Sequence, residues 1–418
     1  MNMIDALAAC LSCGASGLEL ILSLGFMPLT DAYLGSDQLS LPETRYPLDL
    51  AFCGACALVQ ILHRVPPEEM FEDYQYYSSY SDTLLAHSRD HVQGLISTRS
   101  LGPDSLVVEL ASNDGYLLRY FVEEGIPVLG IDPARGPAEA AEAIGVPTMT
   151  EYFGTELAQR LKDQGKVADV VIAKNVLAHV PDLNGFVGGI ATILGDRGVA
   201  EIEVPYLRDL IDRLEFDTIY HEHLCYFSVT ALNELFKRHG LSLNDIRHQS
   251  IHGGTLRLTV GHHEEVSDRV KTYLEDEMAA GMDTFEYYRD FSDRVGEVRK
   301  VLKDMIEGLK RSGKRIAAYG AAAKGTVLLN SSGIGADMID FVVDRNPHKQ
   351  GLYLPGVHVP ITGPDELLKR MPDYLLLLAW NFKDEIIREQ AAYIEAGGRI
   401  IVPIPNPVEL GKEALSST

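Results

Sequence analysis

Residues 219–224 read IYHEHL and place two histidines on either side of a glutamate, directly after a tyrosine. The segment could form a metal site, an acid–base centre or a polar stretch at a domain boundary. A zinc-protease site needs H-E-x-x-H on a helix, whereas the spacing here is H-E-H. The CYFSV that follows is typical of a strand, on which His221 and His223 would face one side and Tyr220 and Glu222 the other. Because the spacing supplies no third ligand, it disfavours a metal site.

Four of the five cysteines form two C-x-x-C pairs, Cys10 with Cys13 and Cys53 with Cys56, and the fifth is Cys225. A C-x-x-C turn can direct two thiolates at one tetrahedral ion, and two such turns complete a Cys₄ site. A redox pair would need only one C-x-x-C beside a βαβ unit. All four ligands are thiols, which leaves no coordination position for water, so we predict a structural zinc ion.

The composition is that of a globular protein of two or three domains, with 418 residues and a net charge of −23. A field of this sign does not attract nucleic acid or an anionic membrane. The sequence has no apolar run of membrane-spanning length, and its start, MNMIDALAAC, lacks the basic residues of a secretory signal. We therefore expect a cytoplasmic protein without nucleic-acid or membrane partners.

A nucleotide-binding unit is predicted near residue 110. The stretch SLVVELASNDGYLLRYFVEEG reads as strand, turn and helix, and IPVLGIDPA as a second strand that ends on Asp132. An acidic residue at that position suits a ribose diol, and Glu109 at the end of the first strand is a second acceptor. The turn from Ala111 to Gly115 lacks G-x-G-x-x-G, which disfavours NAD and favours a smaller adenosine-containing ligand.

Further strands alternate with helices along the chain. ADVVIAKN ends on Asn175 and precedes a helix that carries His179, and GVAEIEVPYL follows as another strand. This alternation predicts a parallel, doubly wound sheet with ligands at the carboxyl ends of the strands. A highly charged helical segment, 266–312, is expected to form a solvated hairpin.

A second Rossmann-like sheet is predicted after this hairpin. KRIAAYGAAAKGTVLLNSSG reads as strand, small-residue turn and helix, and the small residues let backbone amides approach a phosphate. The fold class we predict is α/β, with a Cys₄ zinc module in residues 1–85, a Rossmann-like domain in 86–265, and a helical linker with a second Rossmann-like domain in 266–418.

Taken in order, these motifs resemble the S-adenosylmethionine-dependent C-methyltransferases that act on nucleotide-linked 4-keto deoxysugars in antibiotic and surface-polysaccharide pathways. CLSCG, LGFMPLTDAYL and YPLDLAFCGACALVQ are similar to the zinc module of that family. VELASNDGYLL is similar to its cofactor motif, and YHEHLCYFS, HGGTLRL and YGAAAKGT to its later blocks. The resemblance covers nearly the full length. It implies a class I methyltransferase fold for the central domain, with S-adenosylmethionine and Zn²⁺ as cofactors.

The resemblance also implies roles for individual residues. His223 would remove the proton beside the ketone of a TDP-linked sugar, and methyl would then add to that carbon, most often C3. Tyr220 and Glu222 would position the sugar, and His179 would lie near the ketone oxygen. Tyr76 would line the pocket, although the tyrosines around it could equally form an apolar seam on a connecting helix.

The expected binding residues form two sets. Those for the cofactor are Glu109, Ala111, Ser112, Asn113, Gly115, Asp132, Pro133 and Asn175. Those for the nucleotide sugar are Tyr77, Tyr80, His252, Lys324 and Asn381. Lys324 would contact a phosphate, or else be a surface lysine at a helix start, and His252 would be a pocket residue or only a turn histidine.

Two other functions fit parts of the sequence. One is an S-adenosylmethionine-dependent O-methyltransferase of a sugar or small molecule, and the other is a zinc-containing scaffold without activity. Forming a carbon–carbon bond needs a carbanion equivalent, and a histidine of ordinary pKa, about 6.5, is a suitable base near neutral pH. Oxygen methylation needs no enolate, so the histidine favours carbon methylation by an enzyme, which we expect to be a monomer.

Overall fold

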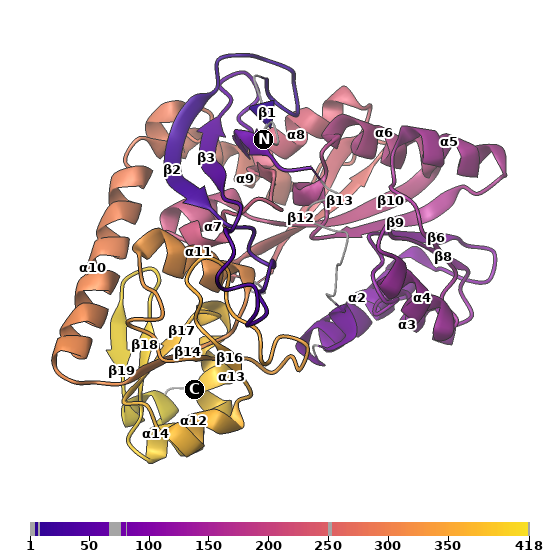
Figure 1. Cartoon of the computed structure of the whole chain (residues 1–418). Helices are drawn as coiled ribbons and strands as arrows, with labels where there is room; N and C mark the ends of the chain where they lie inside the picture. Colours follow the sequence, from indigo (N-terminus) through magenta and orange to yellow (C-terminus); the bar gives the residue numbers. More distant parts are fainter. Residues whose placement is uncertain (1–4, 7–8, 67–76, 81, 250–252, 417–418) are drawn as a thin grey trace.

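The computed structural model describes residues 5–6, 9–66, 77–80, 82–249 and 253–416. Three larger sheets organise these residues (Figure 1), together with a two-stranded sheet of β1 (Asp5–Ala6) and β5 (His63–Arg64). Each larger sheet contains one of the predicted structural units, so the α/β class is confirmed. The domain boundaries after residues 85 and 265 stay predictions.

The zinc module is an antiparallel sheet in the order β11-β4-β3-β2. Its strands are β2 (Glu19–Met27), β3 (Tyr46–Phe52), β4 (Val59–Ile61) and β11 (Cys225–Tyr226). The edge strand β11 comes from the middle of the chain, where Cys225 pairs with Gln60 and Tyr226 with Val59. The residues directly after the IYHEHL segment are therefore fixed by the N-terminal module.

The central sheet has the order β12-β13-β10-β9-β6-β7-β8. Its strands are β6 (Val107–Leu110), β7 (Val128–Ile131), β8 (Thr148–Met149), β9 (Ala168–Lys174), β10 (Leu194–Pro205), β12 (Ser242–Gln249) and β13 (Thr255–Gly261). Strands β10, β9, β6, β7 and β8 are parallel as predicted, whereas β12 and β13 add an antiparallel edge that the sequence analysis missed.

Helices cover both faces of the central sheet (Figure 1). They are α2 (Asp82–Arg99), α3 (Leu118–Glu123), α4 (Arg135–Ala143), α5 (Thr155–Asp163), α6 (Leu183–Ile193) and α8 (Val229–Arg238), while α7 (Leu207–Asp212) follows the end of β10. Successive residues of β6 belong to different apolar clusters: Val107 lies in the cluster that includes residues of α2 and α3, and Val108 in the cluster that includes residues of α5, α6 and α8. This burial on both faces explains why β6 and β9 read as continuous apolar runs.

The C-terminal sheet has the order β16-β15-β14-β17-β18-β19. Its strands are β14 (Ile316–Tyr319), β15 (Val342–Val343), β16 (Ile361–Thr362), β17 (Tyr374–Leu377), β18 (Arg399–Val402) and β19 (Val408–Leu410). Its helices are α11 (Ala323–Ser332), α12 (Asp365–Arg370), α13 (Lys383–Glu389) and α14 (Ala391–Glu395). In this sheet the chain builds outward from β14, first to β15 and β16 on one side and then to β17 and β18 on the other. The central sheet builds outward from β6 in the same way, so the predicted second Rossmann-like sheet is confirmed.

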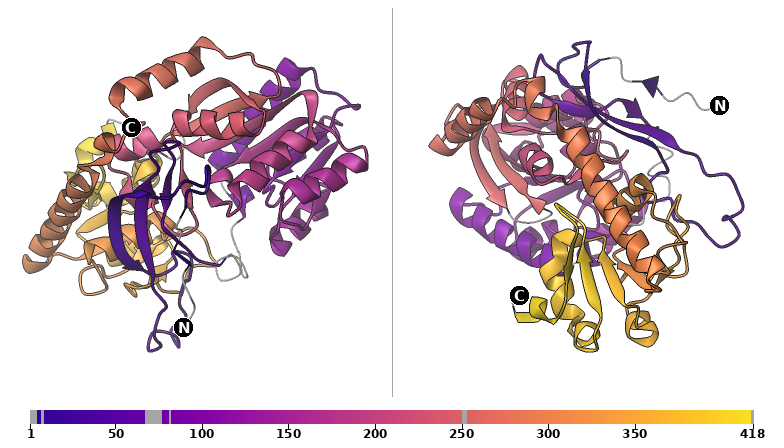
Figure 2. Two further views of the ribbon diagram at one scale, coloured as in Figure 1. Left: turned by 90° about the horizontal axis from the view of Figure 1, so that it is seen from above. Right: turned by 90° about the vertical axis from the view of Figure 1, so that its left-hand side faces the viewer.

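Two helices, α9 (Asp268–Ala280) and α10 (Phe291–Arg311), join the two Rossmann-like sheets. The prediction of a solvated hairpin is wrong for α10, which buries one face. The buried residues recur at helical spacing: Phe291, Val295, Val298, Leu302 and Ile306. This face packs on α11 and on β2 of the zinc module, and Figure 2 shows α10 running beside β2.

Six short 3₁₀ helices occur among the described residues. They are η1 (Ser78–Tyr80), η2 (Leu177–His179), η3 (Phe216–Thr218), η5 (Phe285–Tyr288), η6 (Trp380–Phe382) and η7 (Lys412–Ser416). His179 thus ends a 3₁₀ turn rather than lying on an α-helix. Within the described part of the chain, none of the helices combines the length and apolar character needed to cross a membrane.

Candidate active site

The four cysteines of the two C-x-x-C pairs converge on one point. The Sγ atoms of Cys10 and Cys56 are 3.6 Å apart, those of Cys13 and Cys53 are 3.6 Å apart, and all four lie within 4.8 Å of one another. Tetrahedral coordination with Zn–S bonds of about 2.3 Å places sulfur atoms about 3.8 Å apart. The cysteines are free thiols, so the donor set fits a closed, structural zinc site.

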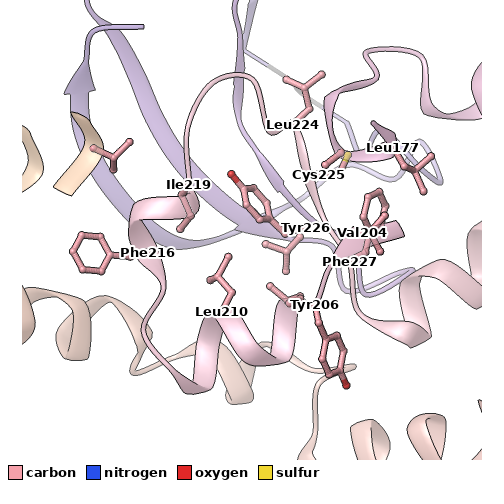
Figure 3. Packing of buried hydrophobic residues seen from close by; sticks show 14 of the residues in the cluster. Leu177, Val204, Tyr206, Leu210, Phe216, Ile219, Leu224, Cys225, Tyr226 and Phe227 are labelled. Atoms are coloured by element: carbon pink, nitrogen blue, oxygen red, sulfur yellow. The ribbon is translucent and has the colours of Figure 1, made fainter. Parts of the chain in front are cut away.

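The segment from residue 216 to 227 is anchored by its apolar side chains. Phe216, Ile219, Leu224 and Phe227 are buried, and Figure 3 shows them around Leu210 and Tyr226. Backbone hydrogen bonds join the Leu224 nitrogen to the Ala178 oxygen (2.7 Å) and the Ile61 nitrogen to the Leu224 oxygen (3.0 Å). The polar residues of IYHEHL are therefore held on a rigid apolar base.

Residues 220–223 form a turn rather than a strand, so the predicted alternation of faces is wrong. The His223 nitrogen donates to the Tyr220 oxygen at 3.0 Å, and the two rings stack with centroids 4.1 Å apart. His221 points elsewhere, with Nε2 at 3.3 Å from the Pro47 oxygen and its ring against Tyr46. A turn brings residues three apart together, which is why Tyr220 and His223 meet and the two histidines separate.

The hydrogen bonds of His223 define its tautomer. Nδ1 lies 3.2 Å from the Thr218 carbonyl oxygen, which can only accept, so the ring proton is on Nδ1. In the neutral ring, Nε2 then carries a lone pair and accepts from the Tyr220 hydroxyl at 3.0 Å. His223 thus presents a basic nitrogen beside a phenol.

Both histidines of this site are held neutral. Burial, followed by the nearby His179, lowers the pKa of His223 well below its usual value of 6.5. Burial also lowers the pKa of His179 to about 4, and the two rings meet edge to face with centroids 4.6 Å apart. His223 therefore does not have the ordinary histidine pKa expected from the sequence.

Glu222 is buried against the zinc module. Its two carboxyl oxygens lie 3.2 and 3.0 Å from the Thr30 hydroxyl, which comes from the loop between β2 and β3. Burial, followed by the charge of Asp31, raises the pKa of Glu222 to about 8. The carboxyl group is therefore mostly protonated at neutral pH.

The C-terminal domain reaches this site through Lys324 and Trp380. The Lys324 ammonium lies 4.9 Å from the centroid of the Trp380 ring, whose Nε1 donates to Asp217 Oδ2 at 2.7 Å. Among the described residues, Lys324 Nζ is buried without a hydrogen-bond partner. Burial raises the pKa of Asp217 to about 6 and that of Glu215 to about 7, and the charge of Lys324 opposes both shifts.

Lys324 therefore faces a domain boundary, and its predicted contact with a phosphate stays a prediction. Asn381 is half-buried beside Trp380, and its predicted place in the sugar pocket likewise stays a prediction.

The carboxyl ends of β6 and β7 carry the predicted cofactor loop. Asp132 accepts from the backbone nitrogens of Asn113 and Ala134, both at 2.8 Å. The turn bends sharply, with positive φ at Ala111, Asn113 and Gly115. Burial raises the pKa of Glu109, at the end of β6, well above its usual value.

Several buried polar atoms of this loop lack a hydrogen-bond partner among the described residues. They are both carboxyl oxygens of Glu109, the hydroxyl of Ser112 and Oδ1 of Asp114. Buried polar groups are nearly always hydrogen-bonded, so these unpartnered atoms suit the donors of a polar ligand.

The loop is also linked to η1 from outside the sheet. The Asn113 side-chain oxygen accepts from the Ser78 nitrogen (2.9 Å), and Asp114 Oδ2 accepts from the Ser79 nitrogen (3.1 Å). The sequence analysis missed Asp114, although it lies inside the quoted motif. It also missed Thr30, for which the sequence offers no separate signal.

The other predicted residues are spread around this edge of the sheet. Asn175 has positive φ after β9, and Pro133 is exposed at the entry to α4. The Tyr77 hydroxyl lies next to Gly136, which follows shortly after Asp132 in the chain; a Cβ atom added to Gly136 would be 3.0 Å from this hydroxyl. Tyr80 is the last residue of η1. Tyr76 and His252 lie outside the described residues, so their predicted roles stay predictions.

Family models match three consecutive parts of the chain. Residues 10–71 match the family described as "Putative zinc binding domain", residues 85–245 a methyltransferase domain, and residues 250–405 a C-methyltransferase C-terminal domain. The three matches follow the order of the three larger sheets.

Curated proteins are similar over different lengths. C-methyltransferase NovU of Streptomyces niveus is 35% identical over 416 residues, which cover 99% of this chain and 99% of that protein. Ubiquinone biosynthesis O-methyltransferase of Bartonella quintana (strain Toulouse) is 27% identical over 94 residues, which cover 22% of this chain and 38% of that protein.

Among solved structures, magnesium protoporphyrin IX methyltransferase of Synechocystis PCC 6803 is 17% identical with a TM-score of 0.33, over 46% of this chain and 87% of that chain.

Proposed function

This chain belongs to the family of S-adenosylmethionine-dependent C-methyltransferases, and from that premise we propose that it methylates a ring carbon beside the ketone of a TDP-linked 4-keto deoxysugar. C3 is the carbon that the family resemblance favours. The observation that carries the proposal is the neutral His223, whose Nε2 lone pair meets the Tyr220 hydroxyl at 3.0 Å.

The cofactor loop fits S-adenosylmethionine. This cofactor carries a sulfonium, an ammonium and a ribose diol, and when bound it supplies a methyl group that is already activated. The loop offers three buried acidic side chains, Glu109, Asp114 and Asp132, and the first two have oxygens without partners among the described residues. Acidic acceptors at the ends of adjacent parallel strands suit such a cation and its ribose.

His223 is the base in the proposed reaction. Removing a proton beside the ketone leaves an enolate, in which the carbon is nucleophilic. Nε2 would take that proton, so the sugar must replace the Tyr220 hydroxyl at this nitrogen. A base of lowered pKa is weak, and the enolate therefore has to be stabilised by a donor at the ketone oxygen. The ring N–H of neutral His179, next to His223, is suited to that donation.

We place the nucleotide on the C-terminal sheet. In the loop after β14, the Ala321 backbone nitrogen donates to Asp344 Oδ2 at 2.7 Å. The cofactor loop after β6 contains the same kind of contact, in which the Asn113 backbone nitrogen donates to Asp132 Oδ2. Repetition of the strand order and of this contact supports a second nucleotide-type site. In this proposal the enzyme is a monomer that works in the cytoplasm.

Product analysis tests the proposed reaction. The protein is incubated with S-adenosylmethionine and a panel of TDP-4-ketosugars, and the products are examined by mass spectrometry and NMR. We expect a new methyl group bonded to a ring carbon next to the ketone. A methyl group on oxygen would instead support the O-methyltransferase alternative, and no transfer to any ketosugar would reject this substrate class.

Proton exchange tests the enolate separately. In D₂O with the inactive product S-adenosylhomocysteine in place of the cofactor, we expect the unreacted ketosugar to gain deuterium at the carbon to be methylated. The reason is that proton removal by His223 does not require methyl transfer. Mass spectrometry of recovered substrate gives the exchange rate, and the His223→Ala variant is the control that should lose it. Exchange in that variant at the wild-type rate would exclude His223 as the base.

The pH dependence of turnover follows from the lowered pKa of His223. The neutral ring is the active base, and its folded-state pKa lies well below 6.5. As the pH falls through 6.5, the ring therefore stays neutral, and activity should be lost only at clearly lower pH. Measuring kcat/KM for the sugar from pH 5 to 9 tests this expectation, because this ratio reports the pKa values of the free enzyme. An acidic limb centred on 6.5 would contradict it.

A further inference from the structure

The contact between Thr30 and Glu222 joins the zinc module to the turn of residues 220–223, which carries His223 and is called the catalytic turn below. Thr30 is 1% exposed and Glu222 9% exposed, and the hydroxyl lies within 3.2 Å of both carboxyl oxygens. Thr30 is the side chain that hydrogen-bonds Glu222 among the described residues. The two residues are 192 positions apart in the chain.

The loop that carries Thr30 is itself fixed from the C-terminal domain. The Thr326 hydroxyl donates to the Thr30 carbonyl oxygen at 3.3 Å. The Tyr33 hydroxyl donates to the Ala321 carbonyl oxygen at 2.7 Å, and Lys349 Nζ lies 4.9 Å from the centroid of the Tyr33 ring. Thr30 therefore stands where the zinc module, the catalytic turn and the C-terminal domain meet.

Losing the Thr30 hydroxyl would leave a buried carboxyl group without its side-chain partner. A buried polar group without a hydrogen-bond partner is strongly disfavoured, so the Glu222 side chain would turn toward another partner or toward water. Glu222 directly precedes His223 in the turn, so such a movement would disturb the pocket in which the sugar is aligned. A displacement of about 1 Å in an active site can cost about a hundredfold in rate.

We propose that Thr30 is a positioning residue for methyl transfer, which the zinc module contributes by holding the Glu222 carboxyl group in place. This inference rests on the proposed function, since that assigns Glu222 to the sugar. It gives the structural zinc site a catalytic consequence: the ion fixes the module whose loop presents the Thr30 hydroxyl.

Hydroxyl removal tests the proposal. Thr30→Val keeps the shape of the side chain but not the donor, and should lower kcat at least about tenfold with little change in KM for S-adenosylmethionine. Thr30→Ser restores a donor and should recover most of the lost turnover, which a purely packing role for the threonine methyl would not allow. Thr44→Val, on an exposed threonine of the same loop, is the matched control. Zinc content should equal that of the wild type in all three variants.

A double-mutant cycle decides whether Thr30 acts through Glu222. In the Glu222→Leu background, which has no acceptor for the Thr30 hydroxyl, Thr30→Val should change kcat by less than about twofold, because the interaction is already absent. The proposal is overturned if Thr30→Val has the same effect in both backgrounds, if Thr30→Val alone stays within about twofold of wild type, or if Glu222→Leu is fully active. Failure of the proposed function would be seen separately, as absence of carbon methylation by the wild type.

Discussion

Replacing His223 with alanine should lower kcat by about 10²–10⁴-fold, the range that a positioned general base contributes. The basic Nε2 is the atom removed, and within the described part of the chain the neighbouring histidines are oriented differently: His179 meets His223 edge to face, and His221 is turned toward Pro47. Binding of S-adenosylmethionine should stay near the wild-type level, because the cofactor loop lies on β6 and β7. Turnover by chromatography of the product and binding by calorimetry give the two quantities.

His263→Ala is the matched control for this experiment. His263 is exposed and pairs with Asp196 at the far end of the sheet, so its loss should leave kcat unchanged. A thermal melt of both variants separates lost catalysis from lost folding. Near-normal turnover by a folded His223→Ala enzyme would remove His223 from the role of base.

Replacing Cys53 with serine should abolish zinc binding and unfold the N-terminal module. A structural zinc site contributes about 10–16 kcal/mol of binding free energy that is also folding free energy, so the loss of one thiolate is severe. Strand β11 pairs with β4 of this module, which places the turn carrying His223 next to the damage. We therefore expect zinc per chain to fall from one to near zero, a lower Tm and a loss of turnover.

Cys225→Ala provides the control for a buried cysteine outside the cluster, and it should retain one zinc ion per chain. Metal content is read by atomic emission spectroscopy, and Tm by differential scanning fluorimetry. Prolonged treatment with a strong chelator should reproduce the effects of Cys53→Ser on the wild type. A fully stable, active protein without zinc after either treatment would show that the Cys₄ cluster does not support the fold.

Local patterns in the sequence predicted the main structural units correctly. Two C-x-x-C turns bring four thiols together because each turn orients its own pair, and the antiparallel sheet between them closes the site. The apolar runs before Ala111 and Gly320 become central parallel strands because both faces of those strands are buried. The C-x-x-C turns depend on residues close together in the chain, and the buried strands on short runs of apolar residues. Both kinds of pattern can be recognised in a single sequence.

The geometry of the active site was decided only by the tertiary structure. Sequence spacing put His221 and His223 on one face, whereas the turn separates them and stacks Tyr220 on His223. The lowered pKa of His223 arises from burial, which no local pattern reveals.

Contacts between domains could not be predicted from the sequence at all. Thr30 reaches Glu222 across 192 positions, and Trp380 reaches Asp217 across 163. Such pairs follow from how whole sheets pack against one another. The sequence therefore determined which elements form and which residues can do chemistry, and packing over long distances determined which of those residues meet.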